Sequence, residues 1–272
     1  MFKDLLIKWV TEISDKFVQV GTNGYLSIGI GSFNATLYSY VKGIMTNIIM
    51  PVAYVILALF FVLELYKASI KVDGAGGGNS FGAEIVFKVM FRMVLCKLAV
   101  DSSLLFMEAI YSVGQNLISG ISSVIASNTV TYGLDLNEIV SEINSMNMGE
   151  QIGMFLELSL IKIAVSLIIG LIEVMCVGRF IEIYIYVAVS PIPIATFPSD
   201  DLNQIGKGFL RSFAAVCLQG AIIYLVLSFF PILVNSNILG EVGILGMLLY
   251  SLVLAIGIFT SGRLAKSICN AI

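Results

Sequence analysis

The chain contains no histidine, and only 12% of its 272 residues are charged. The absence of histidine excludes catalysis and metal binding through imidazole. Soluble domains carry about 25% charged residues, so the low charge and the 58% of hydrophobic residues predict an integral membrane protein. A net charge of −3 and the lack of a Lys/Arg cluster argue against a nucleic-acid-binding surface.

Motifs for catalysis and cofactors are also missing. The glycine-rich stretch 73–80 lacks the Gly-Lys-Ser/Thr ending of a phosphate-binding loop. Asp101 is the only aspartate expected inside a span, so the aspartate pair of an intramembrane protease is not available. The four cysteines are far apart, form no CxxC motif and are expected to be small buried hydrophobes. We therefore expect no enzymatic activity, no cofactor and no metal site.

Long continuous apolar runs predict an all-α membrane protein with about five transmembrane helices. Residues 1–47 are expected to form an external amphipathic or interfacial segment, and residues 48–272 a polytopic membrane domain. The predicted spans are about 51–66, 81–117, 158–189, 209–234 and 242–261. They leave an external loop at 118–157 and cytoplasmic loops at 67–80 and 190–208.

The first twenty residues carry an apolar stripe opposite mixed charges, with Phe2, Leu5, Trp9, Ile13 and Phe17 at spacings of three and four. Interspersed charges exclude the long apolar run of a signal peptide. Two interpretations stay open at this point. The segment is either an interfacial helix lying on the membrane, or a helix packed on the protein's own domain.

The distribution of lysine and arginine predicts the orientation of the chain. These residues occur in the loop after the first span, between the third and fourth spans, and in the C-terminal tail. The two loops on the other side have none. Because positive residues accumulate on the cytoplasmic side, we expect the N-terminus outside and the C-terminus inside, although lysines in the N-terminal segment argue weakly against this.

A polar stripe is predicted at membrane depth in the second span. At 100° per residue, Lys97, Asp101 and Glu108 fall within about 40° of each other on one helix face. Lys97 and Asp101 can pair at i, i+4. The stripe is either a self-satisfied pair buried between helices or a lining that faces an aqueous path, and the sequence leaves both interpretations open.

The stretch 159–201 is the most distinctive part of the chain, because it places Glu173, Arg179 and Glu182 in an apolar run. Such charges face protein or water rather than lipid, and Arg179 can pair with Glu182 at i, i+3. Prolines then predict a stiff, extended break at the cytoplasmic mouth, where an ATPase could dock. The residues expected at this break are Ser190, Pro191, Pro193, Pro198, Asp200 and Asp201.

These features resemble the TrbL-type (VirB-six-type) polytopic inner-membrane subunit of conjugative type IV secretion systems. The resemblance lies in the five-span layout, the long outer loop before the third span, and the aromatic-aliphatic run from Gly178 to Val189 that ends in Ser-Pro-Ile-Pro. It extends from about Pro51 onward. The short N-terminus and short outer loop are typical of the form found in mobile elements of Gram-positive bacteria.

The resemblance implies a non-enzymatic channel or scaffold subunit in the bacterial cytoplasmic (inner) membrane. Such subunits assemble as a ring homo-oligomer, expected to be a pentamer, within the lipid bilayer. They work beside other secretion-system membrane subunits and an ATPase. The implied substrate is single-stranded DNA with an attached relaxase protein.

Two other classes of function stay open. Prolines that break a membrane helix beside a charged site are typical of transporters, including ABC-type permeases. The second span has no counterpart of the Ser-Pro-Ile-Pro break, however, and an odd number of spans does not divide into two equal halves. A structural or assembly protein without a conducting role is the third class. A closed ring with a central pore would favour the channel over both.

The predicted orientation can be tested at Asn137 in the external loop. A cysteine introduced there is expected to react with a membrane-impermeant thiol reagent in intact cells, because the loop 118–157 lies outside. Labelling is measured against the parent protein, which has its four natural cysteines. Reaction only after cell lysis would contradict the orientation.

Overall fold

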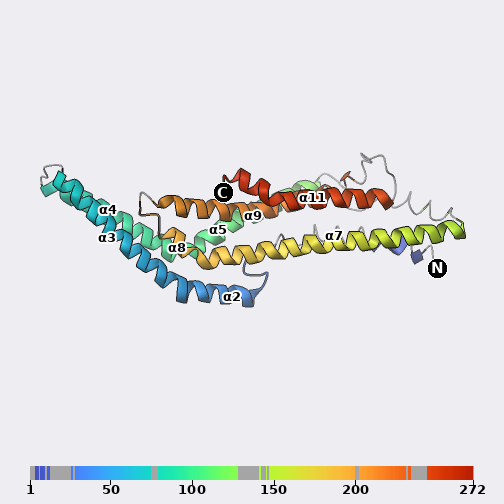
Figure 1. Ribbon diagram of the computed structural model, residues 1–272, viewed down its shortest axis with the longest axis horizontal. Helices are drawn as coiled ribbons and strands as arrows, with labels where there is room; N and C mark the ends of the chain where they lie inside the picture. The colour runs from blue at the N-terminus through green and yellow to red at the C-terminus, as the bar shows by residue number, and fades with distance from the viewer. Residues whose placement is uncertain are drawn as a thin grey trace. The chain divides into compact units, whose positions relative to one another are not determined.

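The computed structural model describes residues 4–5, 7–9, 11–12, 26, 28–74, 79–127, 141, 145, 147–199, 202–230, 232–233 and 244–271. Within these residues the regular secondary structure is helical (Figure 1). The elements are α2 (Ala35–Ile44), the π-helix η1 (Met45–Ile49), α3 (Met50–Gly74), α4 (Asn79–Asp101), α5 (Ser103–Ser127), α7 (Met148–Val189), α8 (Pro191–Ile194), α9 (Asn203–Ser228) and α11 (Ile244–Ile268).

Four of the described helices are long and apolar enough to cross a membrane, which confirms the prediction of an all-α membrane protein. They comprise residues Ala35–Val72, Ile152–Val189, Asn203–Ser228 and Leu248–Ile268. These helices correspond to four of the five predicted spans. The remaining predicted span, 81–117, has a different structure.

The predicted span 81–117 is divided into two helices by a turn at Ser102. α4 ends at Asp101 and α5 begins at Ser103. Helical hydrogen bonds continue on both sides of the bend, from Ser102 N–H to the Leu98 carbonyl at 3.0 Å and from Phe106 N–H to the Ser102 carbonyl at 3.1 Å. Serine pairs are among the usual causes of such bends, and Ser102-Ser103 is such a pair.

The first membrane helix begins well before Pro51, the residue at which the sequence placed its start. Asn34 caps α2 by accepting a hydrogen bond from Leu37 N–H at 2.9 Å. The helix then widens into η1, where Met50 N–H bonds to the Met45 carbonyl five residues earlier. A proline inside a helix lacks an N–H and crowds the preceding turn. The π-helix relieves this crowding, so the helix continues through Pro51 into α3.

The connections between helices are shorter than predicted. α3 extends to Gly74 and α4 begins at Asn79, so most of the predicted loop 67–80 is helical. α5 reaches Ser127 and α7 begins at Met148, so both ends of the predicted loop 118–157 are helical as well. Asp135 and Glu138 of this loop, and Asn137 as the labelling position, lie outside the described residues.

The chain forms two compact units. Unit 1 contains residues Met1–Gly29, Gly114–Arg179 and Leu218–Ala265. Unit 2 contains residues Ile30–Val113, Phe180–Cys217 and Lys266–Ile272. The chain divides between them within α5, α7, α9 and α11.

The core of unit 1 is built on a buried stripe of α7. Leu158, Ile161 and Val165 are buried at spacings of three and four and pack with Tyr250 and Leu254 of α11. Further along the same stripe, a second cluster joins α7 to α9 and α11 through Ile172, Cys176, Ile223, Tyr224 and Ile258. Because buried residues recur at this spacing, one side of this part of α7 packs against the rest of unit 1.

The described N-terminal residues pack on α7 within unit 1. The Trp9 ring stacks on Phe155 with 4.8 Å between centroids. Lys162 of α7 lies 4.6 Å from the centre of the same indole ring and 2.6 Å from a carboxylate oxygen of Glu12. Of the two interpretations left open for this segment, packing on the protein's own domain therefore agrees with these contacts. Its external side stays a prediction.

Unit 2 contains an antiparallel pair of helices, α3 and α4, with α8 packed against both (Figure 1). Its core joins Ala53 and Leu57 of α3 to Met93 and Val100 of α4 and Ile194 of α8. A second cluster lies around Phe180, whose ring stacks on Phe33 with 4.0 Å between centroids.

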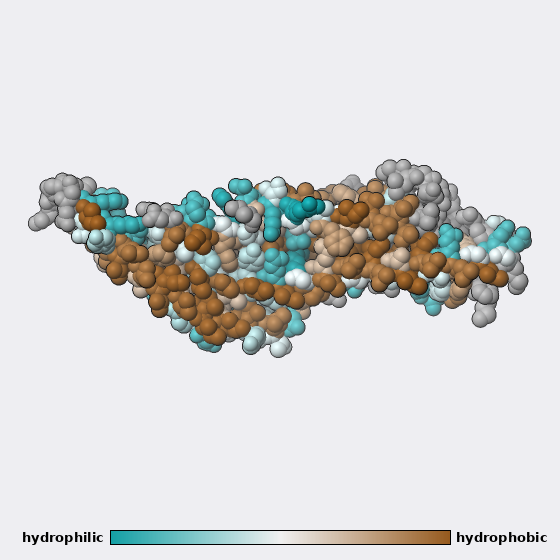
Figure 2. Space-filling view, in the orientation of Figure 1, coloured by the Kyte–Doolittle hydropathy of each residue, from teal (hydrophilic) through white to brown (hydrophobic). Residues whose placement is uncertain are grey.

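The outward surface of α3 is apolar. Val55 is 68% exposed and Val62 is 65% exposed, and Leu59 between them is also exposed. Figure 2 shows this apolar surface and, beyond it, hydrophilic side chains near the end of the α3–α4 pair. Such a surface suits lipid contact, which agrees with α3 being part of a membrane-spanning helix.

Candidate functional site: polar side chains on the membrane helices

Lys97 and Asp101 form the predicted ion pair on α4. The Lys97 ammonium lies 2.8 Å from a carboxylate oxygen of Asp101. Tyr54 of α3 donates its hydroxyl proton to the other carboxylate oxygen at 2.6 Å. Its ring centre lies 5.7 Å from the Lys97 ammonium. The three side chains thus form one network between α3 and α4, and Asp101 has two donors.

Glu108, the third residue of the predicted stripe, lies beyond the bend on α5. It accepts a hydrogen bond from the Tyr38 hydroxyl of α2. Each acid of the stripe therefore has a tyrosine donor from the helix that begins at Ala35. A charge-assisted hydrogen bond of this kind partly replaces the hydration that a carboxylate loses at membrane depth.

The stripe is satisfied by its own neighbours but is not buried. The Lys97 side chain is 61% exposed and the Asp101 side chain 33% exposed, and Glu108 is exposed too. Of the two interpretations left open for the stripe, burial between helices of the chain does not agree with these exposed fractions, whereas the ion pair of Lys97 and Asp101 is present. An exposed charge on a membrane protein faces water or another protein rather than lipid.

Arg179 is buried inside unit 1, where α7 approaches α9. Its side chain is only 3% exposed, and its guanidinium group lies against the backbone of Gly220. A Cβ atom at position 220 would overlap this group. Any side chain at position 220 would overlap the Arg179 guanidinium, so glycine is required at this position of α9.

The two acids predicted near Arg179 have a different environment. Glu173 and Glu182 are both exposed on α7. The ion pair between Arg179 and Glu182 stays a prediction. Exposed carboxylates on a membrane-spanning helix, like those of the stripe, need water or a neighbouring protein.

The break after α7 is helical, so the predicted extended conformation is wrong. Ser190 has φ −50° and ψ −35°, and Pro191 opens the single turn α8. Proline is tolerated there because the first turn of a helix has unpaired N–H groups anyway. The Ser190 hydroxyl donates to the Val187 carbonyl at 2.9 Å, and the Thr196 hydroxyl donates to the Pro193 carbonyl at 2.7 Å. Local hydrogen bonds thus stabilise the turn.

The residues of the break that were expected to dock a partner are largely buried. Ser190, Pro191, Pro193 and Pro198 are all buried in unit 2. Gly206 of α9 packs so closely that a Cβ there would lie 2.6 Å from the Pro193 carbonyl oxygen. Their direct role is thus packing, and docking of an ATPase at this turn stays a prediction. Asp200 and Asp201 lie outside the described residues.

Sequence reasoning missed the residues that complete these sites. Tyr38 and Tyr54 are 70 and 47 residues away from the acids that they contact, and Gly220 is equally remote from Arg179. A tyrosine or a glycine in an apolar helix gives no sign of its distant partner. The charges in the apolar runs indicated only that hydrogen-bond donors, and room for the charged side chains, had to be provided elsewhere in the chain.

Among the described residues, no group of three or more Cys, Asp or Glu side chains could hold a metal ion. The described features therefore define a class of protein, an all-α multi-pass membrane protein with charged side chains grouped on α4, α5 and α7, of which α7 contains a candidate span.

The chain belongs to the family described as TrbL/VirB6 plasmid conjugal transfer like protein, which it matches over residues 19–191. The matched region includes α2 to α7 and thus the polar stripe and Arg179. The resemblance drawn from the sequence is confirmed. The chain is accordingly a component of conjugal transfer machinery of the type IV secretion class, a complex of several subunits. No curated protein and no solved structure matches the chain.

The contact between Arg179 and Gly220 can be tested by adding one methyl group. Gly220→Ala is expected to lower the stability of the purified protein by roughly 1–3 kcal/mol, because the new methyl group overpacks the site of the guanidinium. Thermal unfolding in mild detergent measures this.

Gly208→Ala is the matched control, since it lies on the same helix and its Cβ would meet nothing within 4 Å. It is expected to be neutral or slightly stabilising. Adding Arg179→Ala to Gly220→Ala should remove most of the overlap penalty. Equal stability of the two alanine variants at positions 208 and 220 would refute the close contact.

Proposed function

We propose that this chain is a channel-forming subunit of a conjugative type IV secretion machine. In this proposal it helps to form the path for single-stranded DNA and its attached relaxase through the bacterial cytoplasmic membrane. It acts without catalysing a reaction. It assembles as a ring, with five copies as the expected number, beside other membrane subunits and an ATPase.

The observation that supports a channel best is the exposed stripe of Lys97, Asp101 and Glu108. Charged side chains are costly in hydrocarbon and mark water-filled paths or protein contacts in membrane proteins. The structure satisfies each acid of the stripe from within the chain, by Tyr38, Tyr54 and Lys97. A partner subunit is therefore not needed to pair with Lys97 and Asp101, which favours water as the neighbour of this pair.

The hydrogen bonds of the stripe also bear on the substrate. DNA is a polyanion, and a bare carboxylate in a narrow path would repel it. Asp101 is paired with a lysine and a tyrosine, so its charge is locally balanced. A balanced polar lining would let a polyanion pass without holding it, whereas a cluster of lysines would bind phosphates strongly.

The role of the stripe can be tested in a mating assay with the complete secretion system. Lys97→Met or Asp101→Asn is expected to lower transfer frequency roughly tenfold or more, because either change unbalances the charge of a lining that the proposal places beside a polyanion. Exchanging the two residues, as Lys97→Asp with Asp101→Lys, should restore part of the transfer. The amount of protein in the membrane is measured in parallel.

The pair of Glu84 and Lys88 on the same helix is the matched control. Its atoms are 2.6 Å apart, and its side chains are 60% and 72% exposed. Removing it with Glu84→Gln and Lys88→Gln should leave transfer nearly unchanged, as for exposed pairs in general. If both pairs matter equally, the stripe has no special role.

The assembly state tests the channel more directly. Protein extracted in mild detergent is expected to form closed rings with a central pore, because a path for DNA must be enclosed by several subunits. Particle imaging and mass measurement give the number of copies. A monomer or dimer with an enclosed cavity near the membrane midplane would favour a transporter and contradict the proposal.

A further inference from the structure

The second half of α5, in unit 1, has two exposed faces of opposite character. Asn116, Ser119, Ser122 and Ser123 are all exposed and fall within an arc of about 120° on the helix. Leu117 and Val124 lie on the other side, and they are 45% and 58% exposed. No residue between Gly114 and Ser127 is charged. The polar face consists of amides and hydroxyls only.

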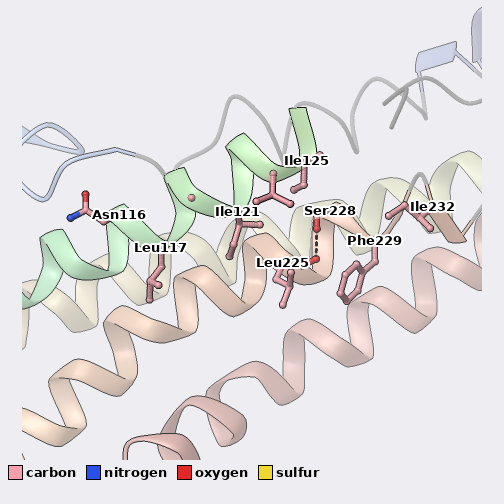
Figure 3. Close-up of a pocket in the computed structure, with 10 residues that line it drawn as sticks. Asn116, Leu117, Ile121, Ile125, Leu225, Ser228, Phe229 and Ile232 are labelled. Atoms are coloured by element: carbon pink, nitrogen blue, oxygen red, sulfur yellow. Dashed lines mark hydrogen bonds between the residues drawn. The ribbon is translucent and has the colours of Figure 1, made fainter. Parts of the chain in front are cut away.

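The apolar face of this segment forms a groove with α9. Leu117 and Ile121 of α5 line one side, with Asn116 at the border of the polar face, and Leu225 of α9 and Phe229 just after it line the other (Figure 3). The groove has a volume of about 540 Å³. The one hydroxyl in its α9 wall, on Ser228, donates to the Leu225 carbonyl at 2.6 Å. This side of α5 is therefore suited to hydrocarbon.

The polar face is less suited to hydrocarbon because it groups four polar side chains, of which Ser123 donates its hydroxyl to the Gly120 carbonyl at 2.8 Å. α5 is still long enough to cross a membrane. Its 25 residues extend about 37 Å, more than the ~30 Å of a hydrocarbon layer. It is nevertheless absent from the four helices that qualify as spans by composition. A helix of this length with one polar side can cross a membrane when that side contacts water or protein.

We propose that α5 crosses the membrane and lines the transport path with the face formed by Asn116, Ser119, Ser122 and Ser123. This inference rests on the proposed channel function and names the wall of that channel in unit 1. The opposite face, with Leu117 and Val124, packs toward lipid and α9.

The chemistry of this face fits a substrate that is both polyanion and polypeptide. Hydroxyl and amide groups can donate and accept hydrogen bonds, so they replace water around phosphates and peptide groups alike. They carry no charge, so they neither repel phosphates nor bind them with the strong, salt-dependent attraction of lysine and arginine. A neutral polar wall therefore allows passage with little sequence preference.

The proposal can be tested by measuring how fast single cysteines react in cells that contain the assembled machine. The four natural cysteines are first replaced, and transfer by this background is verified. Cysteines are then placed at the pairs Ser119/Leu117 and Ser123/Val124, each with one member on the polar face and one on the apolar face. Both members of each pair are exposed, so a difference in rate reports water against lipid rather than burial within the subunit.

A charged methanethiosulfonate reagent is expected to react roughly tenfold or more faster at positions 119 and 123 than at 117 and 124. The reason is that the thiol ionises to the reactive thiolate in water but not in hydrocarbon. Attaching a bulky reagent at position 123 should also block transfer, whereas the same reagent at 124 should not.

Equal rates on both faces, or slow reaction at all four positions, would overturn the assignment of α5. In the first case both faces meet the same medium, and in the second the polar face is covered by protein. Ring formation and the mating assay are measured on the same variants. If the rings and transfer persist, only the lining is wrong. If the parent forms no ring, the channel itself fails.

Discussion

The constraint that shapes this protein is the cost of polar groups in hydrocarbon. Few charges occur in the apolar helices, and each one described in detail has a local solution. Asp101 and Glu108 accept hydrogen bonds from tyrosines, Lys97 pairs with Asp101, and Lys162 pairs with Glu12 beside an indole ring. Apart from the pair of Lys97 and Asp101, which lies on one helix, the donor or acceptor comes from a distant part of the chain and replaces the water that a charged group would otherwise need. The helices are thereby held together by their few polar residues as well as by apolar packing.

Small residues provide the space that these solutions require. Gly220 leaves room for the guanidinium of Arg179, and Gly206 lets α9 approach the Pro193 carbonyl. The two prolines of α8 do not produce an extended chain, because the turn that contains them is buried and hydrogen-bonded. The same principle operates at Pro51, where a π-helical turn absorbs the missing N–H and the helix continues. Close packing thus overrides the local preference of the prolines in α8, and the π-helix accommodates Pro51.

The fold class and the approximate positions of four spans could be predicted from the sequence, because apolar length and charge are local properties. The ion pair of Lys97 and Asp101 was predictable for the same reason, since both residues lie on one helix turn. The bend at Ser102, the helical turn at Pro191 and the contact of Trp9 with Phe155 were not predictable with confidence. Each depends on what packs against the segment. The tyrosine donors are remote in sequence from their acids, so no local pattern could pair them.

By itself, the sequence determined that the protein is a helical membrane protein, which side chains are costly within it, and to which family it is similar. These conclusions follow from composition, hydropathy and short motifs, which do not depend on contacts with distant parts of the chain. Only the tertiary structure decided that the stripe is exposed, that its acids are held by tyrosines, and that Arg179 is buried against Gly220. Which side chains are exposed and which are in contact depends on how segments that are far apart in the sequence pack against each other. Exposure and contact exist only once the helices have packed, because packing decides which face of each helix is left for water or lipid.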